Sequence, residues 1–315
     1  MSSLNEIAGY LKTRDKYVIL THIYPDGDTL GSAYALCRAL RRLDKQANVL
    51  IHGTLAGKFA YLEKDMEKQD FEYETVVTVD IASPSLMGEF KEEFEDKIDV
   101  CIDHHASNDI TASMRYVNAD AASNCENIYY LIRLLGTEID PQLADCIYTG
   151  MCTDTGCFRF TNVTPDTMRI AADLIELGCR NAEINRVMFD TKSLARINIE
   201  REVLNTLRFY ADNKIAVVYT TRDMEKRTGA KDEDMDGLAI IPRQIEGVSA
   251  GITVKEKGDN YYRISVRTNG DHNASWICSK LGGGGHFAAA GCSVQGSLEE
   301  AIEKIVHAAV DELSL

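Results

Sequence analysis

The sequence contains no Cys-x-x-Cys pair, although nine cysteines are spread over its 315 residues. Structural zinc sites need such paired spacings, and secreted disulfide frameworks place an even number of cysteines in a short chain. The cysteines here lie singly in apolar segments, as at Cys37 and Cys101. This pattern indicates reduced, buried thiols and excludes a disulfide-stapled secreted domain.

Long apolar runs are also missing. No segment reaches the roughly eighteen apolar residues that a membrane-spanning helix needs. The N-terminus, Met1 to Glu6, lacks the basic region and apolar run of a secretory signal. There are only five prolines and no low-complexity tract, so no flexible linker is evident. We therefore expect a cytoplasmic protein that has no membrane partner.

The chain has too few basic residues for a protein that binds long nucleic acid through a basic surface. The chain has 34 Lys and Arg against 49 Asp and Glu, a net charge of −15. Only 13 basic and 16 acidic residues lie in 205–315, so most of the excess acid lies in the first 204 residues. A basic surface for long polyanions is thus excluded. Small anionic substrates stay open, because carboxylates that bind divalent cations reverse the local field.

The first half alternates short apolar runs with helical patterns. The length and the 45% hydrophobic content are sufficient for two domains. Strands are predicted over 17–20, 47–52, 76–79 and 100–102, and helices from Asp28 onward and over 124–135, 141–151 and 165–177. This alternation predicts a mostly parallel sheet flanked by helices.

The pattern restarts after a charged helical stretch over 194–210. Strands are predicted over 215–219, 251–254 and 262–266, and an amphipathic helix over 297–313. We therefore expect an α/β protein of two lobes: a larger N-terminal domain over 1–190, a helical connector over 191–210, and a smaller C-terminal α/β domain over 211–315.

Asp and His residues gather where predicted strands or helices end, which is where open α/β sheets bind ligands. They are His22, Asp26, Asp28, Asp80, Asp103, His104, His105 and Asp154. Carboxylate oxygen with imidazole nitrogen suits a divalent ion such as Mn²⁺, whereas Mg²⁺ prefers fewer nitrogens. Five carboxylates and three imidazoles exceed the needs of one ion, so they favour two ions that share a bridging carboxylate.

Each residue alone has a simpler interpretation. An Asp after a strand is usually a helix cap or a turn residue, and Asp28 before a helix fits that role. The adjacent His104 and His105 are harder to explain by packing, because two imidazoles at the start of a loop gain nothing from it. These residues come from four separate parts of the chain, namely 22–28, 80, 103–105 and 154. Their occurrence together favours a metal or catalytic site.

These residues resemble the four successive motifs of the DHH phosphoesterase superfamily, which is named after a triplet such as Asp103-His104-His105. The other three are the segment His22 to Ser32, Asp80, and Thr153 to Gly156. The run GGGGHFAAAG over 282–291 resembles the signature of the DHHA1 substrate-binding domain. Together with Ser265-Val266-Arg267, this run makes the chain similar to a subgroup of compact oligoribonucleases. Members of that subgroup also act as phosphatases of 3′-phosphoadenosine 5′-phosphate (pAp). The resemblance covers nearly the whole chain.

The resemblance implies a role for each residue. One Mn²⁺ would be held by His22, Asp26 and Asp80, and a second by Asp28, Asp80, His104 and Asp154, with Asp80 bridging; Mg²⁺ or Co²⁺ are alternatives. The catalytic candidates are His105, facing the substrate phosphate, and Asp103, which would orient an imidazole or support the loop. One departure is that relatives often carry a basic residue soon after the bridging aspartate, whereas 81–87 has none.

The second lobe supplies the candidate substrate contacts, which are Arg267, Gly283, Gly284, Gly285 and His286. Consecutive glycines let backbone N–H groups approach an anion, and a helix after them would add its positive N-terminal end. A flexible turn is the simpler interpretation of the run. Arg267 offers a bidentate fork for phosphate, although an isolated arginine at a strand end is usually only solvated.

The implied reaction is hydrolysis by water that two metal ions activate, without a Ser or Cys nucleophile. Its substrates would be short oligoribonucleotides, linear dinucleotides such as pApA, and pAp, giving nucleoside 5′-monophosphates. Long duplex nucleic acid is not expected as a partner, and the commonness of two-fold dimers leaves a homodimer open.

Three other functions are weighed against this one. Length and charge disfavour a RecJ-type exonuclease on single-stranded DNA. The glycine run disfavours a manganese pyrophosphatase. The complete ligand set disfavours a nucleotide sensor that has lost catalysis.

Overall fold

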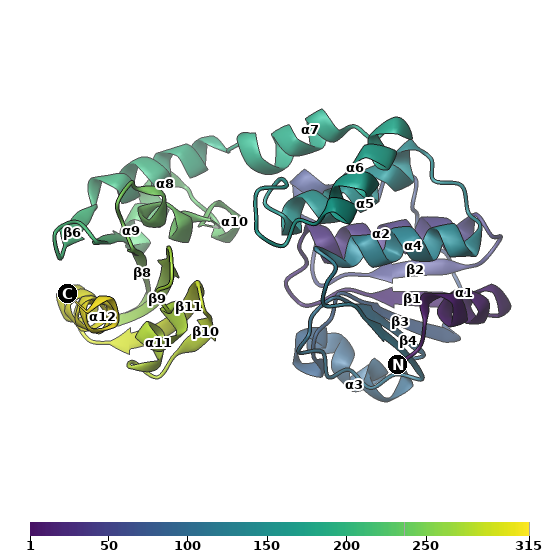
Figure 1. Ribbon diagram of the computed structural model, residues 1–315, viewed down its shortest axis with the longest axis horizontal. Coiled ribbons are helices and arrows are strands. Elements are labelled where there is room, and N and C mark those ends of the chain that lie inside the picture. Colours follow the sequence, from purple (N-terminus) through teal and green to yellow (C-terminus); the bar gives the residue numbers. More distant parts are fainter. Residues whose placement is uncertain (236, 315) are drawn as a thin grey trace. The chain divides into compact units, whose positions relative to one another are not determined.

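The computed structural model describes residues 1–235 and 237–314. Its internal contacts divide the chain into two compact units, Met1–Thr191 and Lys192–Leu315 (Figure 1). Each unit contains one β-sheet with helices packed on it. The predicted α/β class is therefore confirmed.

The sheet of the first unit is parallel throughout, in the order β2-β1-β3-β4-β5. Its strands are β1 (Tyr17–Leu20), β2 (Ala47–Leu50), β3 (Thr75–Val79), β4 (Val100–Asp103) and β5 (Met114–Val117). Four of them lie where apolar runs predicted strands, although β2 ends two residues early. The edge strand β5 was not predicted, because its residues are half-buried and mix polar with apolar side chains.

Alternating side chains of this sheet enter two different cores. Tyr17 and Ile19 pack with the helices on one face, whereas Val18 and Leu20 pack with a smaller cluster on the other. The helices of the first face are α1 (Leu4–Thr13), α2 (Gly27–Arg41), α4 (Asn124–Leu135), α5 (Pro141–Asp154) and α6 (Pro165–Glu176). The short helix α3 (Lys91–Phe94) lies on the opposite face, below the sheet in Figure 1. The unit ends with α7 (Asn181–Asn185) and a π-helical turn, Arg186–Asp190.

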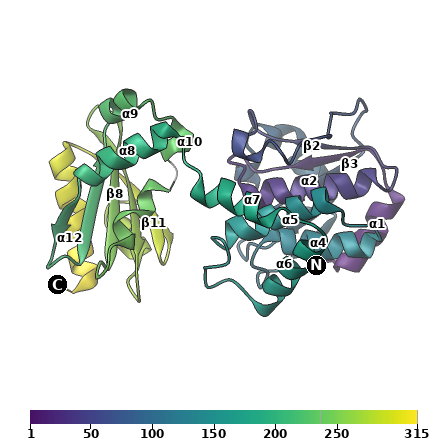
Figure 2. The ribbon, with the colours of Figure 1, turned by 90° about the horizontal axis from the view of Figure 1, so that it is seen from above.

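The second unit is built on a six-stranded mixed sheet, in the order β10-β11-β9-β8-β7-β6. The strands are β6 (Arg208–Tyr210), β7 (Ile215–Thr220), β8 (Ala250–Gly258), β9 (Tyr261–Thr268), β10 (Gly284–His286) and β11 (Ala289–Gln295). One face carries α11 (Ala274–Ser279) and α12 (Leu298–Leu313), which runs beside the strands in Figure 2. The other face carries α8 (Leu194–Asn205). Two short helices, α9 (Arg222–Thr228) and α10 (Asp232–Met235), pack against α8. Helix α12 begins with a capping box formed by Ser297 and Glu300, close to its predicted start.

Two predictions about the second unit were wrong. The helix expected over 194–210 ends at Asn205, and Arg208–Tyr210 forms β6, antiparallel to β7. A turn over 211–213, whose residues have φ of 51°, 50° and 66°, closes this hairpin, so strand pairing outweighs the helical pattern. No helix follows the glycine run either; it leads from α11 into the hairpin of β10 and β11.

All nine cysteines are free, and eight of them are buried. The exception is Cys157, which is partly exposed. Within the described ranges, no helix is both long enough and apolar enough to cross a membrane.

Candidate metal centre

The carboxyl ends of three neighbouring strands bring the predicted polar residues together. His22 follows β1, Asp80 follows β3 and Asp103 ends β4. Because β1, β3 and β4 are parallel and adjacent, these residues lie at one edge of the sheet. The start of α2 adds Asp26 and Asp28 to this edge, and the end of α5 adds Asp154.

Asp80 lies at the centre of this group and is only 3% exposed. Its Oδ2 is 3.8 Å from His22 Nε2, while its Oδ1 is 3.4 Å from His104 Nε2 and 3.6 Å from His105 Nδ1. Its backbone has φ of 57°, in the left-handed region that few residues other than glycine adopt. The two carboxylate oxygens of this one residue thus face two different sets of side chains.

The first set consists of His22, Asp26 and Asp80. His22 Nε2 lies 3.7 Å from Asp26 Oδ1. Asp26 also caps α2, since its side chain accepts hydrogen bonds from the backbone N–H groups of Asp28 and Thr29 at 3.0 and 3.1 Å. Burial opposes a charge on Asp26, but its contacts with His22 and these N–H groups hold its pKa below the ordinary value. The cap is therefore Asp26, and Asp28 is free for another role.

The second set consists of Asp28, His104 and Asp154. His104 Nε2 lies 3.6 Å from Asp28 Oδ2 and 3.3 Å from Asp154 Oδ2. The fully buried Asp28 is held by the first turn of α4, where the N–H groups of Asn124 and Cys125 donate to its carboxylate at 2.6 and 2.9 Å. This helix N-terminus stabilises a negative charge at Asp28.

The electrostatics of both sets favour a bound cation. Burial, together with repulsion from neighbouring carboxylates, raises the pKa of Asp28 and Asp80 and brings that of Asp154 to about 10. Burial opposes a charge on His104, but Asp28 and Asp154 outweigh it and raise its pKa. Asp80 Oδ1 and His104 Nε2 are buried and have no hydrogen-bond partner among the described residues. The donor set and these two unpartnered atoms fit a divalent metal ion.

His105 differs from His104 in its surroundings. Its Nδ1 lies 2.8 Å from Asp103 Oδ1, and its side chain is 46% exposed. Burial opposes a charge on Asp103, but the contacts with His105 and Asn108 hold its pKa below the ordinary value. An ionised Asp103 places the proton of His105 on Nδ1, which orients the ring.

Sequence reasoning missed Asn108, which holds Asp103 in place. Its Nδ2 donates to Asp103 Oδ2 at 2.6 Å and to the carbonyl of Ile81 at 2.9 Å. The only signal in the sequence was an Asn soon after two histidines, and turns use Asn for many reasons.

The other predicted residues lie in the second unit. Arg267 is on β9 opposite Ala289 of β11, and no carboxylate in residues 1–235 and 237–314 forms an ion pair with it. The run from Gly282 to His286 is mostly exposed. The N–H of Gly283 donates to the carbonyl of Cys278, so that group is engaged within the fold. Glycine is required at 283 for space, because a Cβ there would lie 2.2 Å from the carbonyl oxygen of Gly291.

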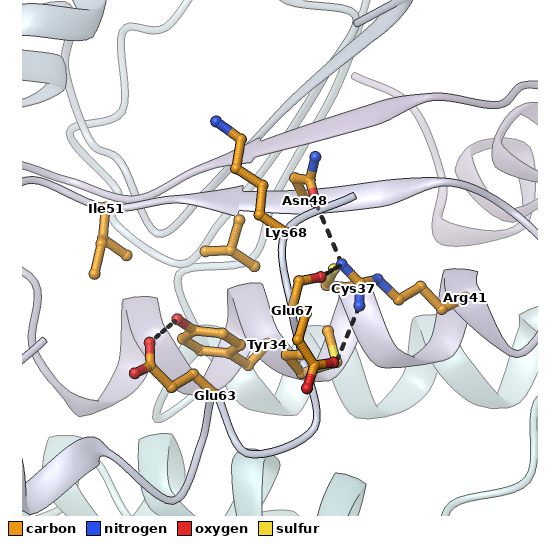
Figure 3. Close-up of a pocket in the computed structure, with 10 residues that line it drawn as sticks. Tyr34, Cys37, Arg41, Asn48, Ile51, Glu63, Glu67 and Lys68 are labelled. Atoms are coloured by element: carbon orange, nitrogen blue, oxygen red, sulfur yellow. Dashed lines mark hydrogen bonds between the residues drawn. The ribbon is translucent and has the colours of Figure 1, made fainter. Parts of the chain in front are cut away.

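A pocket of about 390 Å³ lies elsewhere on the first unit, between α2, β2 and the segment over 63–68 (Figure 3). Its polar groups bond one another: Tyr34 donates to Glu63 at 3.3 Å, and Arg41 donates to Asn48 Oδ1 at 3.3 Å. None of the predicted site residues lines it. The candidate metal centre at the strand ends is therefore separate from this pocket.

Comparison with known proteins connects this cluster to a family. The model of the DHH family N-terminal domain matches residues 16–151, and that of the DHHA1 domain matches 201–314. A Thermus thermophilus protein named bifunctional oligoribonuclease and PAP phosphatase NrnA is 33% identical over 304 residues, 94% of this chain and 90% of that protein. A Bacillus subtilis protein of the same name is 25% identical, over 92% of each chain.

Among solved structures, an exopolyphosphatase-related protein from Bacteroides fragilis matches with a TM-score of 0.88 at 25% identity. The match covers 98% of this chain and 95% of that one. With a buried carboxylate and imidazole cluster at the motif positions, the chain belongs to the DHH family, with a C-terminal DHHA1 domain, and is a hydrolase of phosphoester bonds.

Proposed function

We propose that this protein hydrolyses short oligoribonucleotides to nucleoside 5′-monophosphates and converts pAp to AMP, using two divalent ions. The observation that carries the proposal is Asp80, whose two oxygens face two separate groups of ligand atoms. One ion would be held by His22, Asp26 and Asp80. The other would be held by Asp80, Asp28, His104 and Asp154.

The relatives and the charge distribution support this substrate class. The two curated relatives are named for oligoribonuclease and pAp phosphatase activity. A net charge of −15 opposes binding along a long polyanion. A short substrate has few phosphates, so local contacts at the metal cluster outweigh the repulsion from the rest of the surface.

The chain's own residues position the phosphate and move the proton. Two bound divalent ions supply an activated water and neutralise charge on the phosphoryl oxygens. We propose Mn²⁺ for the mixed nitrogen and oxygen ligand set, with Mg²⁺ or Co²⁺ as alternatives. His105, oriented by Asp103, presents its exposed edge to the phosphate and donates a proton to the leaving oxygen.

In the second unit, we assign substrate contacts to Arg267, Gly283, Gly284, Gly285 and His286. The lack of an acidic partner for Arg267 within the described residues supports this role. Free, buried thiols support a reducing compartment, the cytoplasm. We propose 1–190 as the N-terminal domain and 211–315 as the core of the C-terminal domain. The expected connector 191–210 contributes α8 and β6 to the second unit.

Replacing Arg267 tests its substrate contact. We expect Arg267→Ala to raise KM for pApA about 10-fold or more, because it removes a charge-assisted hydrogen bond to phosphate. The affinity for Mn²⁺, measured by titration calorimetry, should not change. A KM equal to that of the wild type would remove Arg267 from the site.

The proposed function is tested by one panel of substrates at saturating Mn²⁺: pAp, pApA, a pentaribonucleotide, pyrophosphate and a long DNA single strand. We expect AMP from pAp and pApA, mononucleotides from the pentamer, and little turnover of the last two. Preferred cleavage of the long strand would support the RecJ-type alternative, and preferred cleavage of pyrophosphate a pyrophosphatase. No turnover with tight nucleotide binding would support a sensor.

A further inference from the structure

A row of small and basic residues crosses the sheet of the second unit. Gly251 of β8 is paired with Arg267 of β9, Arg267 with Ala289 of β11, and Ala289 with His286 of β10. Residues directly opposite in neighbouring strands point to the same face of a sheet. Arg267 and His286 therefore lie on one face, with the short side chain of Ala289 between them.

This face is not the one that packs on α11 and α12. The alternate residues Ile252, Ile264 and Val266 enter that core, whereas Arg267 lies outside it and is partly exposed. A basic group on this face is thus available to a ligand without breaking the core.

Gly251 brings another arginine to the row. A Cβ at position 251 would lie 2.4 Å from the backbone nitrogen of Arg243 and 2.8 Å from its Cα, so only glycine lets the turn Pro242–Gln244 pack this closely on β8. The side chain of Asn269 holds this turn, because its Nδ2 donates to the carbonyls of Arg243 and Val248 at 3.0 and 2.9 Å. The backbone of Arg243 is therefore fixed next to the strand pair that carries Arg267.

Arg243 and Arg267 both lie beside Gly251 of β8, and neither has an acidic partner among the described residues. Burial, with the positive charge of Arg243 as a further cause, lowers the pKa of Arg267. Among residues 1–235 and 237–314, no carboxylate forms an ion pair with either group. Two arginines that the backbone places beside the same position of a sheet, without a counter-ion, point to an anionic ligand.

We propose that Arg243, Arg267 and His286 form one binding site for a terminal phosphate monoester, and that Arg243 sets the preference for substrates that carry it. The inference rests on the proposed function and deepens it. A monoester is close to a dianion at neutral pH, whereas an internal diester has one negative charge, so two guanidinium groups and an imidazole favour the monoester. Neither the motifs nor the resemblance pointed to Arg243.

The first experiment measures binding without turnover. AMP and adenosine are titrated into the full-length protein in the presence of a chelator, because AMP carries the phosphate monoester and adenosine does not. We expect Arg243→Ala to weaken AMP binding about 10- to 100-fold and Arg243→Lys to weaken it less, with adenosine binding unchanged. The matched control is Arg263→Ala, an exposed arginine on the same strand and face but about 13 Å from Arg267.

The second experiment compares kcat/KM for pApA and for ApA, which lacks the terminal phosphate. We expect the wild type and Arg263→Ala to prefer pApA, and Arg243→Ala to lose most of that preference while its rate on ApA stays within about 3-fold. Equal losses on both substrates, or an intact preference, would overturn the inference. If the wild type cleaves neither dinucleotide, the proposed function fails, and AMP binding alone still decides the role of Arg243.

Discussion

Asp80 combines two demands in one residue. It supplies an oxygen to each of two ligand groups, and it does so from a left-handed backbone that costs about 1–3 kcal/mol in most residues. Strain of this kind persists only where the surroundings hold it in place, and the N–H of Asp80 donates to the carbonyl of Ile102 at 3.0 Å. The backbone conformation of Asp80 thus directs one carboxylate oxygen toward His22 and the other toward His104.

We expect Asp80→Asn to reduce Mn²⁺-dependent hydrolysis of pApA at least about 1,000-fold, because the proposed metal site would lose a negatively charged ligand and gain a neutral amide. Asn tolerates the left-handed conformation, so the fold should survive the change. Activity and melting temperature are measured together, with the exposed Asp109→Ala as the control. Activity close to that of the wild type would refute the bridging role.

Asp103 contacts His105 Nδ1, and its replacement tests whether it orients that ring or supports metal binding. In Asp103→Asn the amide no longer fixes the proton on His105 Nδ1, so we expect kcat to fall about 100-fold or more. The Mn²⁺ concentration that gives half-maximal activity should change little. A large shift in that concentration with an unchanged kcat would mean that Asp103 supports the metal site instead.

At the scale of elements, the contact between α2 and α5 determines where Asp28 and Asp154 meet. Gly150 of α5 faces α2 so closely that a Cβ would lie 2.5 Å from Asp28 Oδ1 and 2.2 Å from Cys125 Sγ. One methyl group at this contact would therefore displace a candidate ligand.

Gly150→Ala should destabilise the protein by about 1–3 kcal/mol through overpacking and also weaken metal binding. Gly9→Ala is the matched control, because it lies in α1 with nothing within 4 Å of the added carbon and should be neutral or slightly stabilising. Urea unfolding and Mn²⁺ titration of both variants test this. Equal effects of the two substitutions would contradict the packing argument.

Elements were predictable where burial gave them a clear pattern. The strands β1, β3 and β4 are buried throughout and read as continuous apolar runs, so the residues at their ends could be placed at one edge. The strands β5, β6 and β10 are partly or fully exposed, and only pairing with a neighbouring strand makes them strands.

The same reason separates the predicted site residues from the missed ones. His104 and His105 are unusual in the sequence itself. Asn108 and Arg243 have no unusual sequence context. In the folded chain Asn108 contacts Asp103 and the backbone of Arg243 packs on Gly251, and no local sequence pattern predicts such contacts.

At the scale of the whole molecule, the buried carboxylates couple stability to pH and metal. Folding raises the pKa of Asp28, Asp80 and Asp154, the last to about 10, so the metal-free fold favours their protonated forms. Their contribution to stability is greatest below the unfolded pKa of about 4 and is lost as pH rises toward the folded values. Metal ions compete with these protons, so metal binding strengthens as pH rises.

We therefore expect Mn²⁺ to raise the melting temperature by about 5 °C or more at about pH 8, and by half of that or less at about pH 6. Chelator should remove the difference, and Asp80→Asn should reduce it. Thermal denaturation at the two pH values provides the test. A stabilisation that is larger at the lower pH would contradict the proposed ligand set.

The backbone conformation of Asp80 also restricts how this position can evolve. Asn and Gly both tolerate a left-handed backbone and are reached from an Asp codon by one nucleotide change, but neither supplies a carboxylate to the proposed metal site. Glu keeps the carboxylate but would have to adopt a backbone that it rarely occupies. A lineage that lost catalysis would thus drift at this position toward Asn or Gly while keeping its fold. Under the proposed function, the residue at the position of Asp80 is then the first to inspect in a relative whose activity is in question.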